Sequence, residues 1–398
     1  MQQVAQSWLL YRLTHSALLL GGIGFASQIP IFLLGPIGGH VADRHNRRTI
    51  LIATQSASML LAFVLAFLTL TNRVLEWHLF VLAALLGIVN AFDIPARQAF
   101  LVEMVDRNDL MNAIALNSSM FNGARIVGPA VAGLIVAAIG EGWCFFANAI
   151  SYVAVIGGLV MMKLKRIAAA PAAGSALKNI AEGFRFAAHT APVRALLVLI
   201  GVVSFTALPY TVLMPVFADR IFHSGARGLG ILMGAAGAGA LLGSIALAAR
   251  STLKGLGTWV AVACAAFGIA LTAFSFSRNF VLSSILLLCA GMAMMVQMAS
   301  SNTLIQSMVP DELRGRMMAL YAMMFMGTGP FGALLAGSIA ERIGAPLTVA
   351  AGGALTILAA IVFATRLPVL RGPARELILA QQAAAGEPQE PTTSVVPR

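Results

Sequence analysis

The chain has 398 residues, of which 59% are hydrophobic and only 10% are charged, and its formal net charge is +11. Globular proteins in water carry roughly 25% charged residues, so this composition excludes a soluble globular fold. Repeated apolar runs of about 20 residues match the hydrocarbon core of a bilayer, and they lack the polar alternation of a transmembrane β-barrel. The predicted fold class is an all-α polytopic membrane protein.

The excess of Lys and Arg suits loops that lie between apolar spans, where basic residues hold segments on the cytoplasmic side. A nucleic acid partner is therefore not expected. The cysteines, Cys144, Cys264 and Cys289, fall within apolar runs and show no metal-ligand spacing. They are interpreted as small buried hydrophobic residues, and neither a metal nor a cofactor is expected.

Eleven apolar segments are predicted to span the membrane, and residues 4–13 are predicted to be the end of a twelfth, N-terminal span. With the loop after Arg12 outside, the inside loops and the tail hold 18 basic residues and the outside loops hold six. This split predicts a multi-pass cell-membrane protein with both termini in the cytoplasm. The eleven segments are residues 17–42, 49–70, 77–100, 113–139, 143–162, 193–218, 229–248, 257–276, 280–303, 317–339 and 345–365.

An internal repeat relates residues 101–140 to residues 304–344. Both stretches run from an acidic loop through a helix to Gly-Pro, a further Gly and a closing Gly. A nearly constant offset between matching positions predicts a duplicated six-helix unit, as in many transporter folds. The matching pairs are Leu110/Leu313, Gly128/Gly329, Gly133/Gly337 and Gly140/Gly344, offset by 203, 201, 204 and 204 residues.

Four parts are predicted along the chain. Residues 1–162 form an N-terminal bundle of helices 1–6, and residues 193–366 form a C-terminal bundle of helices 7–12. The linker 163–192 contains an amphipathic helix at 176–187, expected on the cytoplasmic membrane surface. The polar tail 367–398 is expected to be disordered. The repeat offset indicates that helix 1 is partial, so we expect a longer reading frame upstream of Met1.

The loop after the first full span carries a family resemblance. Its sequence from Gly39 to Leu51, GHVADRHNRRTIL, resembles the G-x-L-A-D-R-x-G-R-R/K-x-x-L pattern between helices 2 and 3 of major facilitator superfamily transporters, departing mainly at Asn46. The phrases IPARQAFLVEMV, NGARIVGPAVAG, VLMPVFADRIF and VPDELRGRMMAL resemble the bacterial enterobactin-exporter and macrolide-efflux branch. The resemblance implies a 12-helix fold of two six-helix halves that works by alternating access.

Two residues of this loop have a physical interpretation as a gate. Gly39 would let two helices approach closely, and Asp43, near a helix end, could accept from backbone N–H groups at a neighbouring helix N-terminus. The resemblance implies that Asp43 latches the two halves in the outward-facing state, toward the start of helix 11 near Met317. The alternative is a solvated, positively charged loop without a gating role.

Three arginines of the same loop, Arg44, Arg47 and Arg48, supply donors for carboxylates. The resemblance implies that Glu103 is the acidic partner of Arg47.

A second motif, Gly123, Gly128, Pro129 and Gly133, lies inside the apolar segment 113–139. It is similar to the Gly-Pro-x-x-Gly-Gly pattern of helix 5 in exporters, with Ala132 in place of one Gly. Small residues permit close helix contact, and Pro129 removes a backbone donor and bends the helix. The alternative is a tolerated kink that says nothing about direction.

The charges that lie well inside the apolar segments are Asp93, Arg97 one helical turn later, and Arg125 in the next span. Such charges are costly in lipid and normally face a cavity or pair with one another. The three could form a proton site, an anion-binding site for substrate, or a fixed salt bridge. Nearby guanidinium groups favour the ionised carboxylate, which argues against a proton on Asp93 unless substrate competes for the arginines.

The sequence predicts a secondary-active exporter of a small lipophilic or amphipathic molecule, of the siderophore or drug class, driven by proton antiport. A nucleotide loop of the form GxxxxGK[ST] does not occur in the chain, which favours an ion gradient over ATP. Uptake or lipid flipping by the same fold is the alternative. A membrane enzyme or receptor is less favoured, since no catalytic set or extramembrane domain is found. The expected partners are substrate, protons and lipid, with a monomeric chain.

Overall fold

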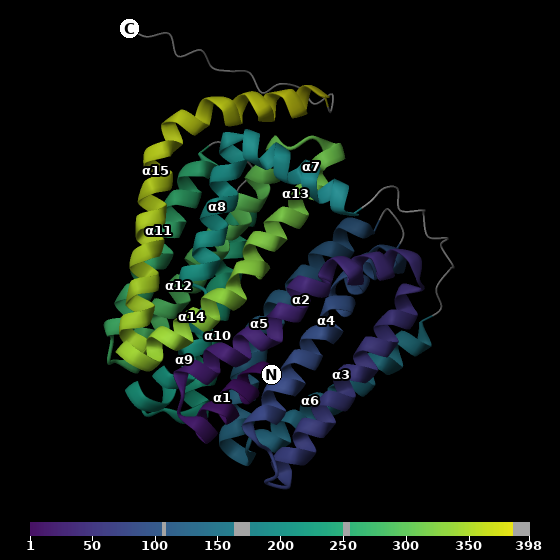
Figure 1. Ribbon diagram of the computed structural model, residues 1–398, viewed down its shortest axis with the longest axis vertical. Coiled ribbons are helices and arrows are strands. Elements are labelled where there is room, and N and C mark those ends of the chain that lie inside the picture. Colours follow the sequence, from purple (N-terminus) through teal and green to yellow (C-terminus); the bar gives the residue numbers. More distant parts are fainter. Residues whose placement is uncertain (106–108, 163–175, 250–254, 385–398) are drawn as a thin grey trace.

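The computed structural model describes residues 1–105, 109–162, 176–249 and 255–384, and all regular elements within these ranges are helical (Figure 1). The expected all-α class is confirmed. The first six helices are α1 (Gln2–Thr14), α2 (Ala17–Arg44), α3 (Arg47–Leu70), α4 (Glu76–Met104), α5 (Leu110–Ile139) and α6 (Glu141–Met161).

A further helix, α7 (Ala176–His189), follows the linker residues and covers the predicted amphipathic segment. The seventh span consists of α8 (Ala191–Thr206), α9 (Tyr210–Val216) and the short π-helix η1 (Phe217–Ile221). The next three spans are α10 (Gly225–Ala248), α11 (Leu256–Phe276) and α12 (Phe280–Met308). The eleventh span consists of α13 (Asp311–Ala322), the short π-helix η2 (Met323–Gly327) and α14 (Thr328–Ile343), and the last is α15 (Ala345–Ala384). The seventh span is interrupted at residues 207–209, where Pro209 has no backbone N–H to continue the helix.

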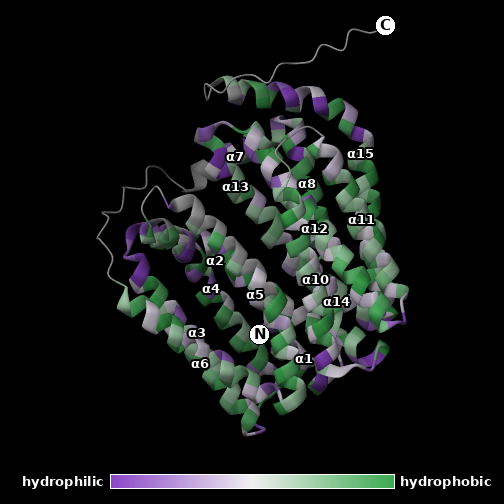
Figure 2. Cartoon of the chain, turned by 180° about the vertical axis from the view of Figure 1, so that it is seen from behind, coloured by the Kyte–Doolittle hydropathy of each residue, from purple (hydrophilic) through white to green (hydrophobic). Residues whose placement is uncertain are grey.

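Ten helices or continuous helix runs in the described ranges are long and apolar enough to cross a bilayer, and α5 adds the shorter apolar stretch Ile126–Ile139. Together they correspond to the eleven predicted spans. Hydrophobic residues cover the length of these helices, and hydrophilic residues gather at their ends (Figure 2). Cys144 and Cys264 are buried as expected, but Cys289 is exposed on α12.

The expectation of a disordered tail from residue 367 is wrong for its first part. Helix α15 continues through Pro368 and Pro373 to Ala384, and it bends across the end of the second half in Figure 1. Leu370, Ala374 and Leu377 pack against the main hydrophobic core. Apolar residues at helical spacing therefore hold this segment in place despite two prolines and several charges. The rest of the tail, 385–398, lies outside the described residues.

The turn between α2 and α3 explains the departure at Asn46 from the family pattern. Asn46 is the N-cap of α3, and its side-chain Oδ1 accepts a hydrogen bond from the backbone N–H of Thr49 at 3.2 Å. Asparagine is among the preferred N-cap residues, because its short side chain satisfies one of the unpaired N–H groups at a helix start. Asn46 thus starts α3 where a glycine would only permit the turn.

Two seams join the first six helices to the second half. In one seam α2 packs against α14, and a Cβ built on Gly337 would lie 2.8 Å from the Cα of Gly21. In the other seam α5 packs against α10, and a Cβ on Gly133 would lie 2.8 Å from the Cα of Gly230. Since glycine has no Cβ, each pair lets two backbones touch, as small residues do in membrane helix packing.

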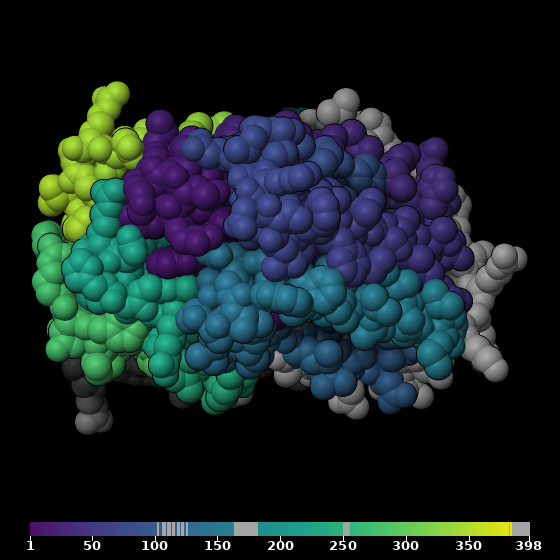
Figure 3. Space-filling view, turned by 90° about the horizontal axis from the view of Figure 1, so that it is seen from below, coloured from purple at the N-terminus to yellow at the C-terminus, as the bar shows by residue number. Residues whose placement is uncertain are grey.

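Both glycine contacts lie toward the same end of the molecule. We call the end that carries the α1–α2 turn the His15 face, and the end that carries the α2–α3 turn the Arg47 face. Each of the four seam glycines lies within about two helical turns of the His15 face. The two halves lie together there and diverge toward the Arg47 face (Figure 1). Seen from the His15 face, the purple N-terminal segment lies directly against teal and green segments of the second half (Figure 3).

Candidate functional site

The loop motif at the Arg47 face ties the ends of several helices together. Arg47, at the start of α3, forms an ion pair with Glu103 near the end of α4, which is the contact that the resemblance implied. Its Nε also donates to the backbone carbonyl of Ala42 at 3.3 Å, and Arg48 donates from Nη2 to the carbonyl of Val160 at 2.5 Å. These contacts all lie within the first six helices. Their role in gating stays a prediction.

Asp43 and Arg44 are placed differently from Arg47. Both are exposed at the end of α2, and neither side chain forms a hydrogen bond or ion pair with another described residue. Met317, near which the latch was expected, is 1% exposed on α13. The structure thus shows Asp43 without the helix contact that was predicted for the outward-facing state.

The close helix contact expected for Gly39 is not formed in this state. A Cβ on Gly39 would meet no heavy atom of the described residues within 4 Å, so its role in the latched state stays a prediction. The preceding residue does form such a contact: a Cβ on Gly38 would overlap the carbonyl oxygen of Ala91 on α4. The motif alone could not show which of two adjacent glycines faces α4, because this depends on how α2 is rotated in the bundle.

Asp93 is the centre of a buried polar cluster between α3 and α4. The residue is 4% exposed, and its Oδ1 accepts from Thr54 Oγ1 at 2.8 Å and from Gln55 Nε2 at 2.7 Å. Its Oδ2 accepts from Arg97 Nε at 3.1 Å and from Arg97 Nη2 at 2.5 Å. Both oxygens face donors only, which is the arrangement that suits an ionised carboxylate.

The two members of this ion pair differ in environment. The Asp93 side chain is 5% exposed, whereas the Arg97 side chain is 61% exposed. The buried carboxylate therefore holds an accessible guanidinium in a fixed position, and that group retains donors for an anion. Arg125 lies on α5, but its side chain is outside the described residues, so its expected place in the cluster stays a prediction.

Among the helix 5 motif residues, Gly133 makes the closest contact, in the seam with α10. A Cβ on Gly123 would meet nothing within 4 Å, and one on Gly128 would lie an ordinary 3.8 Å from the backbone nitrogen of Met1. Among the described residues, Gly133 thus packs closely against another helix and Gly123 does not. Pro129 lies inside α5, and its carbonyl oxygen would be 2.8 Å from a Cβ on Gly230. The motif forms a seam between the halves, and its bearing on direction stays a prediction.

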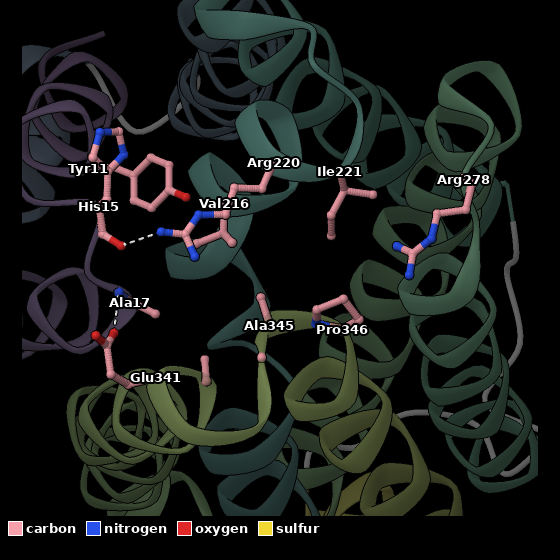
Figure 4. Close-up of a pocket in the computed structure, with 12 residues that line it drawn as sticks. Tyr11, His15, Ala17, Val216, Arg220, Ile221, Arg278, Glu341, Ala345 and Pro346 are labelled. Carbon is pink, nitrogen blue, oxygen red and sulfur yellow. Dashed lines mark hydrogen bonds between the residues drawn. The ribbon is translucent and has the colours of Figure 1, made fainter.

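A cluster at the His15 face was missed by sequence reasoning. It surrounds a pocket of about 390 Å³ between the two halves, lined by Tyr11, His15, Arg220, Arg278 and Glu341 among others (Figure 4). One sequence signal was present. Glu341 lies in the last turn of α14, where the helix dipole disfavours a negative charge, so its partner had to come from elsewhere.

Comparison with known proteins adds to this geometry. A family model described as "Transmembrane secretion effector" (MFS_3) matches residues 1–386. The chain is 28% identical to the staphyloferrin A transporter of Staphylococcus aureus, over 91% of this chain and 90% of that one. It is 29% identical to the multidrug efflux pump Tap of Mycolicibacterium fortuitum (92% and 91%), and 24% identical to the macrolide efflux protein A of Streptococcus pyogenes (90% of each).

The fold is also found among solved structures. A point mutant of the nucleoside transporter NupG superposes with a TM-score of 0.76 over 91% of this chain and 94% of that chain, at 12% identity. At so low an identity the likeness concerns the fold alone. It confirms the 12-helix arrangement that the repeat and the loop motif predicted.

Proposed function

The chain belongs to the transmembrane secretion effector family of the major facilitator superfamily, and we propose that it is a secondary-active exporter of a small lipophilic or amphipathic molecule. It is a multi-pass membrane transporter and not an enzyme. Two of the three relatives are named for efflux, of several drugs and of macrolides, and the third is named for staphyloferrin A transport. These names support export of a molecule of the siderophore or drug class.

The observation that carries the proposal is the one-sided contact between the halves. Backbones touch across both seams toward the His15 face, whereas Asp43 at the Arg47 face has no described partner. The excess of basic residues in the loops of the Arg47 face supports a cytoplasmic position for that face. This geometry suits a carrier that is open to the cytoplasm and ready to load a substrate for export.

Alternating access then requires the opposite contacts to form. When the His15 face opens, Asp43 approaches the start of α13, where unpaired backbone N–H groups can donate hydrogen bonds to its carboxylate. Arg47 and Glu103 hold the α2–α3 turn in place for this contact through their ion pair. Asp43 is thereby the inner latch of the outward-facing state.

The Asp93 cluster supplies the charged part of the transport path in this proposal. Because Arg97 and two neutral donors occupy both carboxylate oxygens, a proton and a positively charged group of the substrate can each bind Asp93 only by displacing Arg97. Proton and substrate then bind this carboxylate in turn and not together, which is the requirement for antiport. The protein functions as a monomer in the bacterial inner membrane, with both termini in the cytoplasm.

Transport in inverted membrane vesicles tests the direction and the energy source. Vesicles whose cytoplasmic side faces outward are prepared with an interior more acidic than the medium. They are then incubated with a panel of fluorescent lipophilic cations, macrolides and siderophores. Accumulation that a protonophore abolishes is the expected result. Accumulation only in right-side-out vesicles would indicate uptake, and movement of labelled lipid alone would indicate flipping. The metabolites secreted by a deletion strain, compared with its parent, would identify the natural substrate.

A further inference from the structure

The turn between α1 and α2 presents two opposite helix ends to the second half. His15 is the C-cap of α1 in the left-handed conformation, with φ of 49°, and Ser16 is the N-cap of α2. The carbonyl end of a helix carries a partial negative charge and the N–H end carries a partial positive charge. Within three residues, the turn therefore offers a site for a cation and a site for an anion.

Glu341 of α14 binds the start of α2. Its Oε2 accepts hydrogen bonds from the backbone N–H of Ala17 at 2.7 Å, from the backbone N–H of Leu18 at 3.1 Å and from Ser16 Oγ at 3.2 Å. Ser16 Oγ in turn accepts from the N–H of Leu19 at 3.3 Å. The first three N–H groups of α2, which have no partner within the helix, are thus satisfied, two of them by a carboxylate from the other half.

Arg220 of η1 binds the end of α1. Its Nη2 donates to the carbonyl oxygen of His15 at 2.9 Å, and its guanidinium carbon lies 5.8 Å from the centre of the Tyr11 ring. The guanidinium therefore meets both a helix C-terminus and the electron-rich face of an aromatic ring. In Figure 4, Arg220 and Glu341 approach the turn from two elements of the second half, on either side of the pocket.

This arrangement is confined to one of the two seams. The seam glycines Gly337 and Gly133 are equivalent in the internal repeat, and the residue four positions later is Glu341 in the first case and Ala137 in the second. The α5–α10 seam accordingly has no carboxylate at the matching place. Among the described side chains, the α5–α10 seam shows close packing and no ion pair, whereas the α2–α14 seam also has a charged contact.

We propose that Glu341 and Arg220 form the outer latch of the transporter, which holds the His15 face closed while the Arg47 face is open. The inference rests on the alternating access of the proposed function. Helices α2 and α14 run antiparallel, so an acid at the end of each can reach the start of the span that contains the other. Glu341 binds the start of α2 in the present state, and Asp43 binds the start of α13 in the opposite state. The two carboxylates act in alternation.

Double electron–electron resonance on the purified full-length chain tests this without a substrate. Spin labels on Arg73→Cys and His223→Cys report the width of the His15 face, and labels on Met161→Cys and Val369→Cys report the width of the Arg47 face, all four being exposed positions. The exposed Cys289 is replaced by Ser to prevent its labelling.

We expect Glu341→Ala to raise the ratio of outward-open to inward-open molecules about fivefold, the effect of losing charge-assisted hydrogen bonds at an exposed site. Glu341→Gln, which keeps an acceptor oxygen, should give a smaller shift.

The matched control is Glu141→Gln. Glu141 also lies at the His15 face and pairs with Arg12 at 3.0 Å, but both residues belong to the first six helices. Its neutralisation should leave both distance distributions unchanged. Asp43→Asn should shift the ratio toward the inward-open state, and Glu341→Ala combined with Asp43→Asn should return it toward the wild-type value.

Two results would overturn the inference: unchanged distances in folded Glu341→Ala protein, or an equal shift in Glu141→Gln. Failure of the proposed function has a different signature. If Glu341→Ala shifts the distances as expected but the wild type accumulates nothing in inverted vesicles, the latch stands and the export proposal fails. If the wild type exports substrate but Glu341→Ala leaves the distances unchanged, the export proposal stands and the latch fails.

Discussion

Arg97 donates two hydrogen bonds to one oxygen of Asp93, yet only Asp93 is buried. The side chain of the carboxylate is 5% exposed and that of the guanidinium is 61% exposed, although they are one helical turn apart. The loss of one partner therefore has different consequences for the other. A stranded arginine lies at the surface of the helix bundle and can move, whereas a stranded carboxylate stays in the protein interior.

The first prediction follows from this asymmetry. Arg97→Gln should lower the free energy of unfolding by about 2–4 kcal/mol, because it leaves a buried carboxylate without a cation. Asp93→Asn should cost only about 1 kcal/mol, since Asn still accepts from Thr54 and Gln55 and Arg97 is free to move. Thermal unfolding of the purified variants in one detergent measures which variant loses more stability. The double variant should recover expression relative to Arg97→Gln alone, and an equal loss from both single changes would contradict the asymmetry.

The same residue gives a test of coupling. If protons exchange at Asp93 as proposed, Asp93→Asn should abolish efflux driven by a pH gradient while membrane expression stays nearly intact. Efflux measured at matched expression separates this from a loss of folded protein. Wild-type efflux by Asp93→Asn would move the proton site elsewhere, and Glu103 would be the next acid to examine.

Neutralising Asp43 should affect transport but not folding. Asp43→Asn removes a charge that has no described partner in this state, so thermal stability should stay within about 0.5 kcal/mol of the wild type. Efflux should fall strongly, because the outward-facing state loses a charge-assisted contact. Glu76→Gln, which neutralises another exposed acid at the opposite face, is the control. Unchanged efflux by Asp43→Asn at equal expression would reject the gating role.

Adjacent glycines of the loop motif should respond in opposite ways to alanine. Gly38→Ala places a Cβ against the carbonyl oxygen of Ala91, well inside van der Waals contact, and should cost about 1–3 kcal/mol through overpacking. Gly39→Ala meets open space and should be neutral or stabilising by up to about 1 kcal/mol, since alanine favours the helix. Expression levels and thermal stability of the two variants test these opposite expectations. A stable Gly38→Ala protein would show that α2 and α4 pack less closely than described.

A residue larger than glycine in the seam should act on the state of the carrier. Gly337→Ala would bring a Cβ to 2.7 Å from the carbonyl oxygen of Ala17, across the two halves, so the His15 face should close less completely. We expect a folded protein with reduced efflux and a wider separation at that face. Gly315→Ala, with nothing within 4 Å of the new Cβ, is the matched change on α13. Equal transport by both variants would contradict a role for the glycine contact.

Much of the molecule was predictable from local patterns. Runs of about 20 apolar residues determine the spans, because a helix must satisfy its own backbone in lipid, and the 204-residue offset between Gly133 and Gly337 determines the duplication. The Arg47–Glu103 ion pair could be predicted from the resemblance of the loop motif to the family pattern. Each of these features depends on spacing along the chain or on a pattern shared with a family.

Other features were decided only when helices distant in sequence packed together. The rotation of α2 in its bundle makes Gly38, and not Gly39, the residue that contacts α4. The approach of α14 to the start of α2 gives Glu341 hydrogen-bond partners at Ser16, Ala17 and Leu18, which are 325, 324 and 323 residues away in the sequence. A carboxylate near a helix end has no partner specified by its neighbours in sequence, because its hydrogen bonds depend on which backbone N–H groups the tertiary fold brings within about 3 Å.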